Sequence, residues 1–134
     1  MSDHDQMTVT FGAGKRVNAH NGAFEIRTDQ SVDNGGDASA PEPYSLFLAS
    51  LATCAGIYVL GFCQKRDIPT DDISLVQNPV RNGEGRIVGF DIDIRVPPSF
   101  PTKYHDALVR VASKCAVKKT MELQPEFRVR TVVD

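Results

Sequence analysis

The stretch PYSLFLASLATCAGIYVLGFCQ, from Pro43 to Gln64, carries no charged residue, although 24% of the 134-residue chain is charged. Pro43 suits the first turn of a helix, Lys65 and Arg66 suit its C-terminal end, and Pro69 stops it. The stretch therefore predicts one helix of 22 residues. A helix of this length that is apolar on all sides must be covered on all sides, by lipid or by protein.

Segments on both sides of this helix alternate apolar and polar residues, which is typical of strands with one buried face. Before the helix these strands are Thr8–Phe11, Arg16–His20 and Ala23–Arg27, and after it they are Ile73–Val80, Arg86–Val96 and Phe127–Val132. Asn21-Gly22 predicts a hairpin turn, and residues 30–43 predict a loop. Thr102 is a suitable N-cap for a second helix that runs to about Cys115. The order β-β-β-α-β-β-α-β predicts an α+β fold with antiparallel sheet and a single domain over residues 1–134.

The composition excludes several classes of function. The chain has 15 basic and 17 acidic residues, so it offers no basic surface for nucleic acid. Its three cysteines are too few for a disulfide scaffold, and the polar, acidic start at Met1–Asp5 is unlike a secretory signal. We therefore expect a reducing, cytoplasmic location. His4, His20 and His105 have no metal-ligand spacing, so we expect no metal site.

Two of the three cysteines are predicted to face the interior, and small residues are predicted to leave room beside one of them, Cys54. On the second predicted helix, Cys115 shares a face with Leu108 and Val111, and a buried core cysteine remains one interpretation of it. On the first helix, Cys54 shares a face with Ser50, Leu51, Tyr58 and Gly61, two of which are small. Cys63 lies half a turn away from Cys54 and is predicted to be a packing residue.

A core thiol is also a valid interpretation of Cys54. This residue lies about ten residues into its helix, too far for the N-terminal dipole of that helix to lower its pKa. A reactive Cys54 would therefore need a cation from elsewhere in the fold. The nearest candidates in sequence are Lys15, Arg16 and Arg27.

The segment Pro43–Cys54, followed some sixty residues later by Lys114–Val117, resembles the OsmC/Ohr family of osmotically induced and organic hydroperoxide resistance proteins. The resemblance covers nearly the whole chain. It implies an intertwined homodimer in which sheets from both chains wrap two long, buried central helices. It further implies a thiol peroxidase: Cys54 would be oxidised by an organic hydroperoxide, and Cys115 would close a disulfide. An external dithiol, lipoyl or thioredoxin-like, would reopen that disulfide, so no bound cofactor is expected.

The resemblance also implies an arginine beside the reactive thiol. Arg16 is the best positional match, although a solvated residue of its strand is the alternative interpretation, and Arg27 is a weaker match. Family peroxidases usually carry a glutamate ten residues before the first cysteine, which orients that arginine. Tyr44 stands at that position here, and Glu42 lies two residues earlier. A second departure is Ala116, where the family usually has proline after the second cysteine.

Three hypotheses follow from different classes of function. The first is a cytoplasmic peroxidase for organic hydroperoxides. The second is a non-peroxidase member of the same family that binds a small hydrophobic or thiol-containing ligand beside Cys54, and the Tyr44 substitution favours it. The third is a membrane-associated protein that uses the charge-free helix. Ser45, Ser50 and Thr53 within that helix disfavour lipid on all sides, whereas a homodimer supplies protein cover, so we expect no membrane partner.

Overall fold

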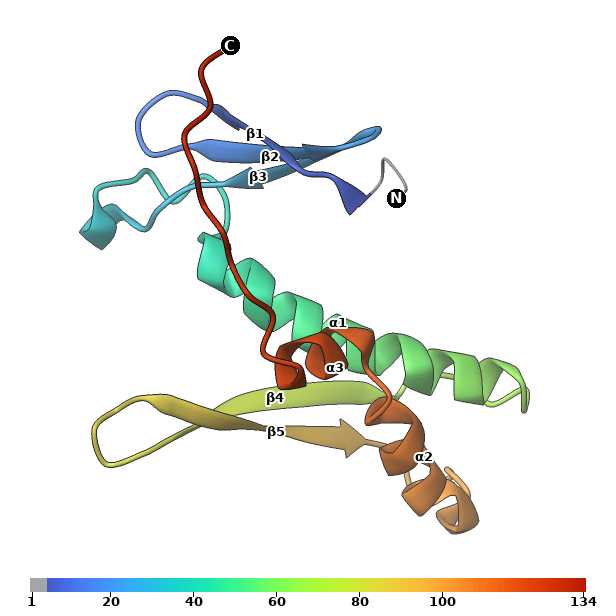
Figure 1. Ribbon diagram of the computed structural model, residues 1–134. Coiled ribbons are helices and arrows are strands. Elements are labelled where there is room, and N and C mark those ends of the chain that lie inside the picture. The colour runs from blue at the N-terminus through green and yellow to red at the C-terminus, as the bar shows by residue number, and fades with distance from the viewer. Residues whose placement is uncertain (1–4) are drawn as a thin grey trace. The chain divides into compact units, whose positions relative to one another are not determined.

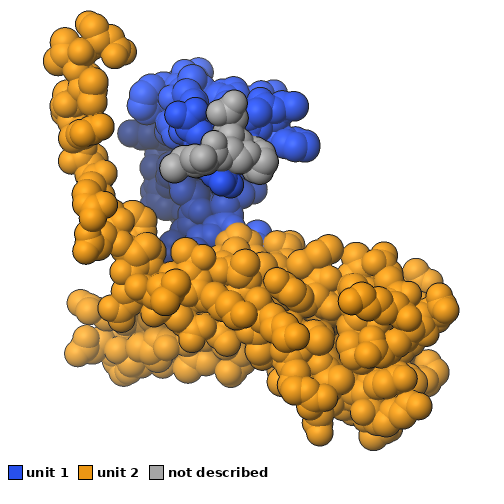
Figure 2. All heavy atoms as spheres, turned by 45° about the vertical axis from the view of Figure 1, so that its right-hand side comes forward, with its two compact units in different colours: residues 1–49 blue, residues 50–134 orange. Residues whose placement is uncertain are grey.

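The computed structural model describes residues 5–134, which form two compact units divided between residues 49 and 50 (Figure 2). The elements follow one another along the chain as an α+β arrangement, as predicted (Figure 1). Three strands form one sheet in the first unit, and two strands form a hairpin in the second. Of the helices, α1 begins in the first unit and continues into the second.

The first unit contains an antiparallel sheet in the order β1-β2-β3, with strands β1 (Thr8–Phe11), β2 (Val17–Asn21) and β3 (Phe24–Thr28). The predicted hairpin turn lies one residue later than expected: Asn21 pairs with Phe24, and Gly22 takes the positive φ of 55° that the turn requires. The register aligns apolar side chains on one face of the sheet, namely Val9, Phe11, Val17, Ala19, Phe24 and Ile26. Within the described chain this face is largely exposed, since Phe11 is 83% and Phe24 76% exposed.

Helix α1 (Pro43–Gln64) has the bounds predicted from the charge-free stretch. Its buried residues recur every three or four positions, at Leu51, Ala55, Val59 and Phe62, so one stripe faces the core. The helix ends where Arg66 folds back: its Nη1 donates to the carbonyl oxygen of Phe62, and its guanidinium lies 3.6 Å from the centre of the Phe62 ring. This contact places a cation at the C-terminus of the helix, as the sequence indicated.

The rest of the second unit packs on this stripe. Strands β4 (Ser74–Arg81) and β5 (Ile87–Arg95) form an antiparallel hairpin, and helices α2 (His105–Ala112) and α3 (Ala116–Glu122) follow (Figure 1). The buried core of this unit consists of Val59, Phe62, Cys63, Phe100 and Leu108, with Leu75 and Ile94 of the hairpin packed against it. Cys63 has no exposed surface, which confirms that it is a packing residue.

The C-terminal half differs from the prediction in two places. The second predicted helix begins with a short 3-10 turn at Thr102–Tyr104 and ends early, because α2 stops at Ala112. A further helix, α3, which was not predicted, begins at Ala116. The predicted last strand, Phe127–Val132, does not form. It follows α3 as an exposed extended segment that runs away from the body of this unit (Figure 1). A strand needs a neighbouring strand for its backbone hydrogen bonds, and no such pairing is present for this segment in the described chain.

Helix α1 is long and apolar enough to cross a membrane, with a mean hydropathy of 2.0, although length and composition alone are weak evidence for that role. Only 28% of its most apolar window is buried within the chain, and Ile57 is 58% exposed. Leu51, Ala55 and Val59 are nevertheless buried by protein on one side, as expected for the core helix of a folded domain.

Candidate active site

The break between α2 and α3 places Cys115 at the start of a helix rather than at the end of one. The Ser113 hydroxyl donates to the carbonyl oxygen of Val109 at 2.8 Å, which satisfies a carbonyl at the end of α2. Cys115 then takes an extended conformation (φ −47°, ψ 122°) as the N-cap of α3. Its Sγ accepts a hydrogen bond from the backbone N–H of Lys118 at 3.4 Å. The sequence has no glycine or proline at this break, so local signals gave no indication of it.

The N-terminus of α3 meets Cys54 in the middle of α1. The sulfur of Cys54 accepts hydrogen bonds from the backbone N–H groups of Val117 and Ala116 and from the thiol of Cys115. Cys54 is half-buried, and Cys115 is 3% exposed. The structure therefore brings together the two cysteines that the resemblance paired.

The surroundings of these two thiols shift their pKa values in opposite directions. The Val117 N–H lowers the pKa of Cys54 most; the Cys115 thiol and the Ala116 N–H lower it further, against the opposing effect of burial. Burial raises the pKa of Cys115. The hydrogen bond to Cys54 and the negative charge of the Cys54 thiolate raise it further. The Lys118 and Val117 amides oppose that rise only in part. Cys54 is therefore the thiol that ionises first, with Cys115 as a neutral donor beside it.

This arrangement contains a group that the sequence reasoning missed. The position of Cys54 in α1 predicts a cation that stabilises its thiolate, but within the second unit backbone amides of another helix do so. The first amides of a helix have no intrahelical acceptor and carry the positive end of its dipole. They were overlooked because Cys115 was placed at the end of a single long helix, where carbonyl oxygens rather than amides would have been available.

A pocket of about 650 Å³ opens beside Cys115, and most of its lining is apolar. Leu51 and Ala55, which flank Cys54 on α1, line one side together with Cys115. The hairpin and α2 supply the remaining apolar lining, chiefly Phe90, Ile92, Ile94, Leu108, Val109 and Ala112. His105 and Lys118 are among the few polar groups in the lining. The pocket is therefore suited to a small apolar molecule with one polar end.

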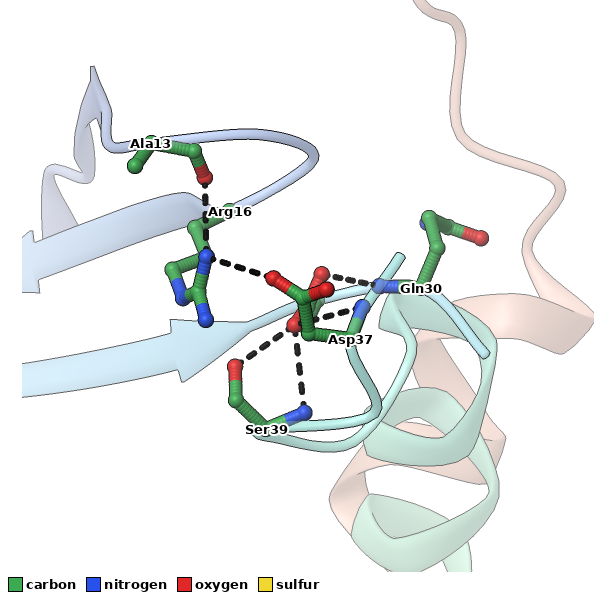
Figure 3. A network of polar contacts seen from close by, with 6 residues as sticks. Ala13, Arg16, Gln30, Asp37 and Ser39 are labelled. Atoms are coloured by element: carbon green, nitrogen blue, oxygen red, sulfur yellow. Dashed lines mark hydrogen bonds and ion pairs between the residues drawn. The ribbon is translucent and has the colours of Figure 1, made fainter. Parts of the chain in front are cut away.

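Arg16 belongs to the first unit, at the start of β2, where the β1–β2 turn brings it back toward Ala13. Its Nη1 donates to the Ala13 carbonyl oxygen at 3.2 Å and forms an ion pair with Asp37 Oδ2 at 3.1 Å (Figure 3). Arg27, the weaker candidate, pairs instead with Glu25 at 3.2 Å. Gly14 lies beside the Arg16–Asp37 pair with a positive φ of 63°, a backbone conformation that glycine adopts without strain.

The two residues considered as replacements for the family glutamate lie near the start of α1 and have other contacts. Glu42 Oε1 accepts from the backbone N–H of Ser31 at 3.1 Å and from the Asn34 amide at 3.4 Å. The ring of Tyr44 lies 5.4 Å from that of Phe47, centre to centre. Neither contact is with Arg16, so within the first unit the structure does not bring Glu42 or Tyr44 to the arginine.

The histidines serve other contacts in the described part of the chain. His20 shares a hydrogen bond of 3.1 Å with Thr10, and His105 stacks on Phe100. His4 lies outside the described residues. Across residues 5–134, no cluster of three or more His, Cys, Asp or Glu side chains could hold a metal ion.

Comparison with known proteins gives the family. The family model of OsmC-like proteins matches residues 35–130. The chain belongs to the OsmC-like protein family. Three solved structures show the same fold for this OsmC-like protein, and all are less than 25% identical to it.

One of the three is a protein from Psychrobacter arcticus named for osmotic stress induction and a detoxification response. Its sequence is 24% identical, the matched region covers 90% of this chain and 88% of the Psychrobacter chain, and the TM-score is 0.70. An OsmC-like protein from Mycoplasma pneumoniae has 17% identity, coverage of 87% and 86%, and a TM-score of 0.61. An organic hydroperoxide resistance protein OsmC from Legionella pneumophila has 18% identity, coverage of 87% and 88%, and a TM-score of 0.52. No curated protein matches the chain significantly.

Proposed function

We propose that this OsmC-like protein is a thiol peroxidase that reduces organic hydroperoxides. The observation that carries the proposal is the environment of Cys54, whose sulfur accepts hydrogen bonds from two α3 amides and from the Cys115 thiol. A nucleophilic cysteine needs a stabilised thiolate, and a two-cysteine cycle needs a second thiol within bonding reach. The family supports the same role, because it includes organic hydroperoxide resistance proteins.

In the proposed cycle, the Cys54 thiolate attacks the outer oxygen of the hydroperoxide ROOH. The O–O bond breaks, Cys54 becomes a sulfenic acid (S–OH), and the leaving alkoxide takes a proton to become the alcohol ROH. The Cys115 thiol then attacks the Cys54 sulfur, which forms the Cys54–Cys115 disulfide and releases water. An external dithiol, lipoyl or thioredoxin-like, reduces the disulfide by two thiol–disulfide exchanges and leaves as its own disulfide.

The remaining groups of the proposed site fit this chemistry. The apolar pocket beside Cys115 would hold the hydrocarbon part of an organic hydroperoxide and would bind the small, polar hydrogen peroxide poorly. Arg16 is the candidate for a cation that binds the peroxide oxygens and the thiolate, as the family resemblance implies. We further propose a cytoplasmic location, where the thiols of the resting protein stay reduced.

We expect reduced protein mixed with one equivalent of cumene hydroperoxide to lose two free thiols and two hydrogens in mass within minutes. The reason is that one turnover converts Cys54 and Cys115 into a disulfide. Thiol titration and intact mass spectrometry measure the two quantities, and addition of dihydrolipoamide should restore both. An unchanged thiol count would refute the peroxidase proposal.

A second candidate function is the binding of a small hydrophobic or thiol-containing molecule without turnover. The size and apolar lining of the pocket favour it, together with the Cys115 thiol at its edge. The same mass measurement distinguishes the two functions. A thiol ligand supplied as its symmetric disulfide would add the mass of one ligand half by thiol–disulfide exchange and would release the other half as a free thiol, whereas the peroxidase cycle removes two hydrogens.

We also propose that the protein works as a homodimer. Within residues 5–134, three apolar surfaces are exposed: the side of α1 at Ile57, the apolar face of the β1–β3 sheet, and the extended segment after α3, where Val129 is 98% exposed. Large contiguous apolar surfaces of this kind are rare on soluble monomers, and a second copy covers the same surfaces on both partners.

We expect the protein to have a mass of about twice 14.7 kDa in light scattering coupled to size exclusion. The variant Ile57→Glu should shift it to the monomer mass, because the charge lies on an exposed position of α1 and would have to be buried between copies. The matched control is Val32→Glu, which is 70% exposed on the loop before α1 and should leave the dimer intact. A monomeric wild-type protein would contradict the homodimer.

A further inference from the structure

The loop after β3 is organised around one buried carboxylate, Asp29, which has no exposed surface. Its Oδ1 accepts from the Gln30 N–H at 2.7 Å, and its Oδ2 accepts from the Ser39 N–H at 3.1 Å and from the Ser39 hydroxyl (Figure 3). The Asp37 N–H completes the set at 3.4 Å. These bonds, the Ser39 hydroxyl first among them, lower the pKa of Asp29 to about 2, so the carboxylate stays ionised at neutral pH.

The backbone of the same loop packs closely on itself at Gly36. A Cβ atom on Gly36 would lie 2.2 Å from the carbonyl oxygen of Gln30, so only glycine fits there. The Ala38 N–H donates to that carbonyl at 3.0 Å. Hydrogen bonds and close packing therefore fix the backbone on both sides of Asp37. This ordered backbone determines where the Asp37 side chain begins.

Asp37 uses this position to hold Arg16 (Figure 3). Both contacts of the guanidinium in the described chain, to Ala13 and to Asp37, use Nη1, and they approach it from two separate loops. An arginine side chain has many rotamers, and two fixed acceptors select among them before any ligand arrives. The Nε and Nη2 groups take no part in these two contacts, and they are the donors that we assign to an incoming oxygen.

We propose that Asp37 is the positioning residue of Arg16, carried by the loop that Asp29 organises. The inference rests on the proposed peroxidase function, in which Arg16 binds the peroxide. Two other carboxylates of this unit are engaged elsewhere: Glu42 accepts from Ser31 and Asn34, and Glu25 pairs with Arg27. Asp37 thus supplies the carboxylate contact that position 44, a tyrosine in this chain, lacks.

The test is a double-mutant cycle in steady-state turnover of cumene hydroperoxide with dihydrolipoamide as reductant. Asp37→Asn should lower kcat/KM two- to fivefold, the range expected for loss of one exposed ion pair. In an Arg16→Met background, the same change should have no further effect, because Asp37 acts through the arginine. Asp37→Glu should restore part of the loss. Asp33→Asn, a carboxylate on the same loop, is the matched control and should match the wild type.

The outcomes separate this inference from the function on which it rests. A wild-type protein that consumes no cumene hydroperoxide overturns both. An active wild type with an equally active Asp37→Asn variant overturns the role of Asp37 alone. Equal losses from Asp37→Asn with and without Arg16 would also overturn it, because they would reveal an effect on the loop rather than on the arginine. Thermal unfolding of each variant checks that the unit stays folded.

Discussion

We expect replacement of Cys54 by serine to abolish hydroperoxide turnover, with a loss of at least about 10³-fold, as for removal of a nucleophile in other enzymes. Serine preserves the size of the side chain and can still accept hydrogen bonds from the α3 amides. Its hydroxyl, however, is not ionised near neutral pH and does not attack a peroxide bond. The measurement is consumption of cumene hydroperoxide in the presence of dihydrolipoamide.

The variant Cys115→Ser should separate the two proposed thiol roles. It should consume one equivalent of hydroperoxide and then stop, leaving a sulfenic acid at Cys54 that a dimedone adduct reveals by mass. Cys63→Ala is the matched control, because Cys63 is a buried thiol of the same helix as Cys54 but belongs to the core. It should retain turnover. A Cys115→Ser protein that retains full turnover, or a Cys54→Ser protein with more than a tenth of wild-type activity, would refute the assigned roles.

The sequence predicted the elements whose signals are local. The bounds of α1 followed from a charge-free run between Pro43 and the pair Lys65-Arg66. The β4–β5 hairpin followed from the turn residues at 82–85 and from the alternation in Phe90–Val96. These signals arise from the pattern of apolar and polar residues within one segment, and this pattern can be seen in a single sequence. The family resemblance then paired Cys54 with Cys115, and the structure places the two thiols in hydrogen-bond contact.

Features that depend on contacts between distant segments were not predicted. The break at Cys115 has no glycine or proline, and it becomes favourable only when its sulfur caps α3 and the freed amides meet Cys54. Asp37 looked like an ordinary loop residue because its contact with Arg16 depends on a loop organised by Asp29, more than ten residues away from Arg16. The alternation in Phe127–Val132 is genuine, but a strand also needs a neighbouring strand, and the described part of the chain does not provide one.

The second large effect concerns the Val117 amide, the strongest of the groups that lower the pKa of Cys54. We expect Val117→Pro, which removes this N–H, to slow alkylation of Cys54 by iodoacetamide at pH 7 by about tenfold. This factor corresponds to the free energy of a typical hydrogen bond to a charged group. The alkylation profile should move to higher pH, because a thiolate with fewer donors forms less readily. The experiment uses a Cys63→Ala background, and peptide mapping assigns the alkylated site to Cys54.

Proline in the first turn of a helix costs no intrahelical hydrogen bond, which makes this variant feasible. The matched control is Ala116→Pro. Its preceding residue, Cys115, already has an extended conformation that proline favours, and it removes only the weakest of the three donors to Cys54. It should slow alkylation less than about threefold. Lys118→Ala tests the alternative that the side-chain cation, rather than the backbone, activates the thiol, and it should leave the rate unchanged.

Proline at position 117 also disfavours the helical conformation of Ala116, so a second variant without that strain is needed. A synthetic peptide of residues 115–134 can be ligated at Cys115 with the Val117 amide replaced by an ester, which exchanges only N–H for O. If the amide acts as a hydrogen-bond donor to the thiolate, the ester and the proline variant should slow alkylation to a similar extent. If only the proline variant is slow, the reactivity of Cys54 depends on the path of α3 and not on this N–H. If the ester protein is alkylated as fast as the wild type, the Val117 N–H does not activate Cys54. A cation would then be the better explanation, with Arg16 as the first candidate.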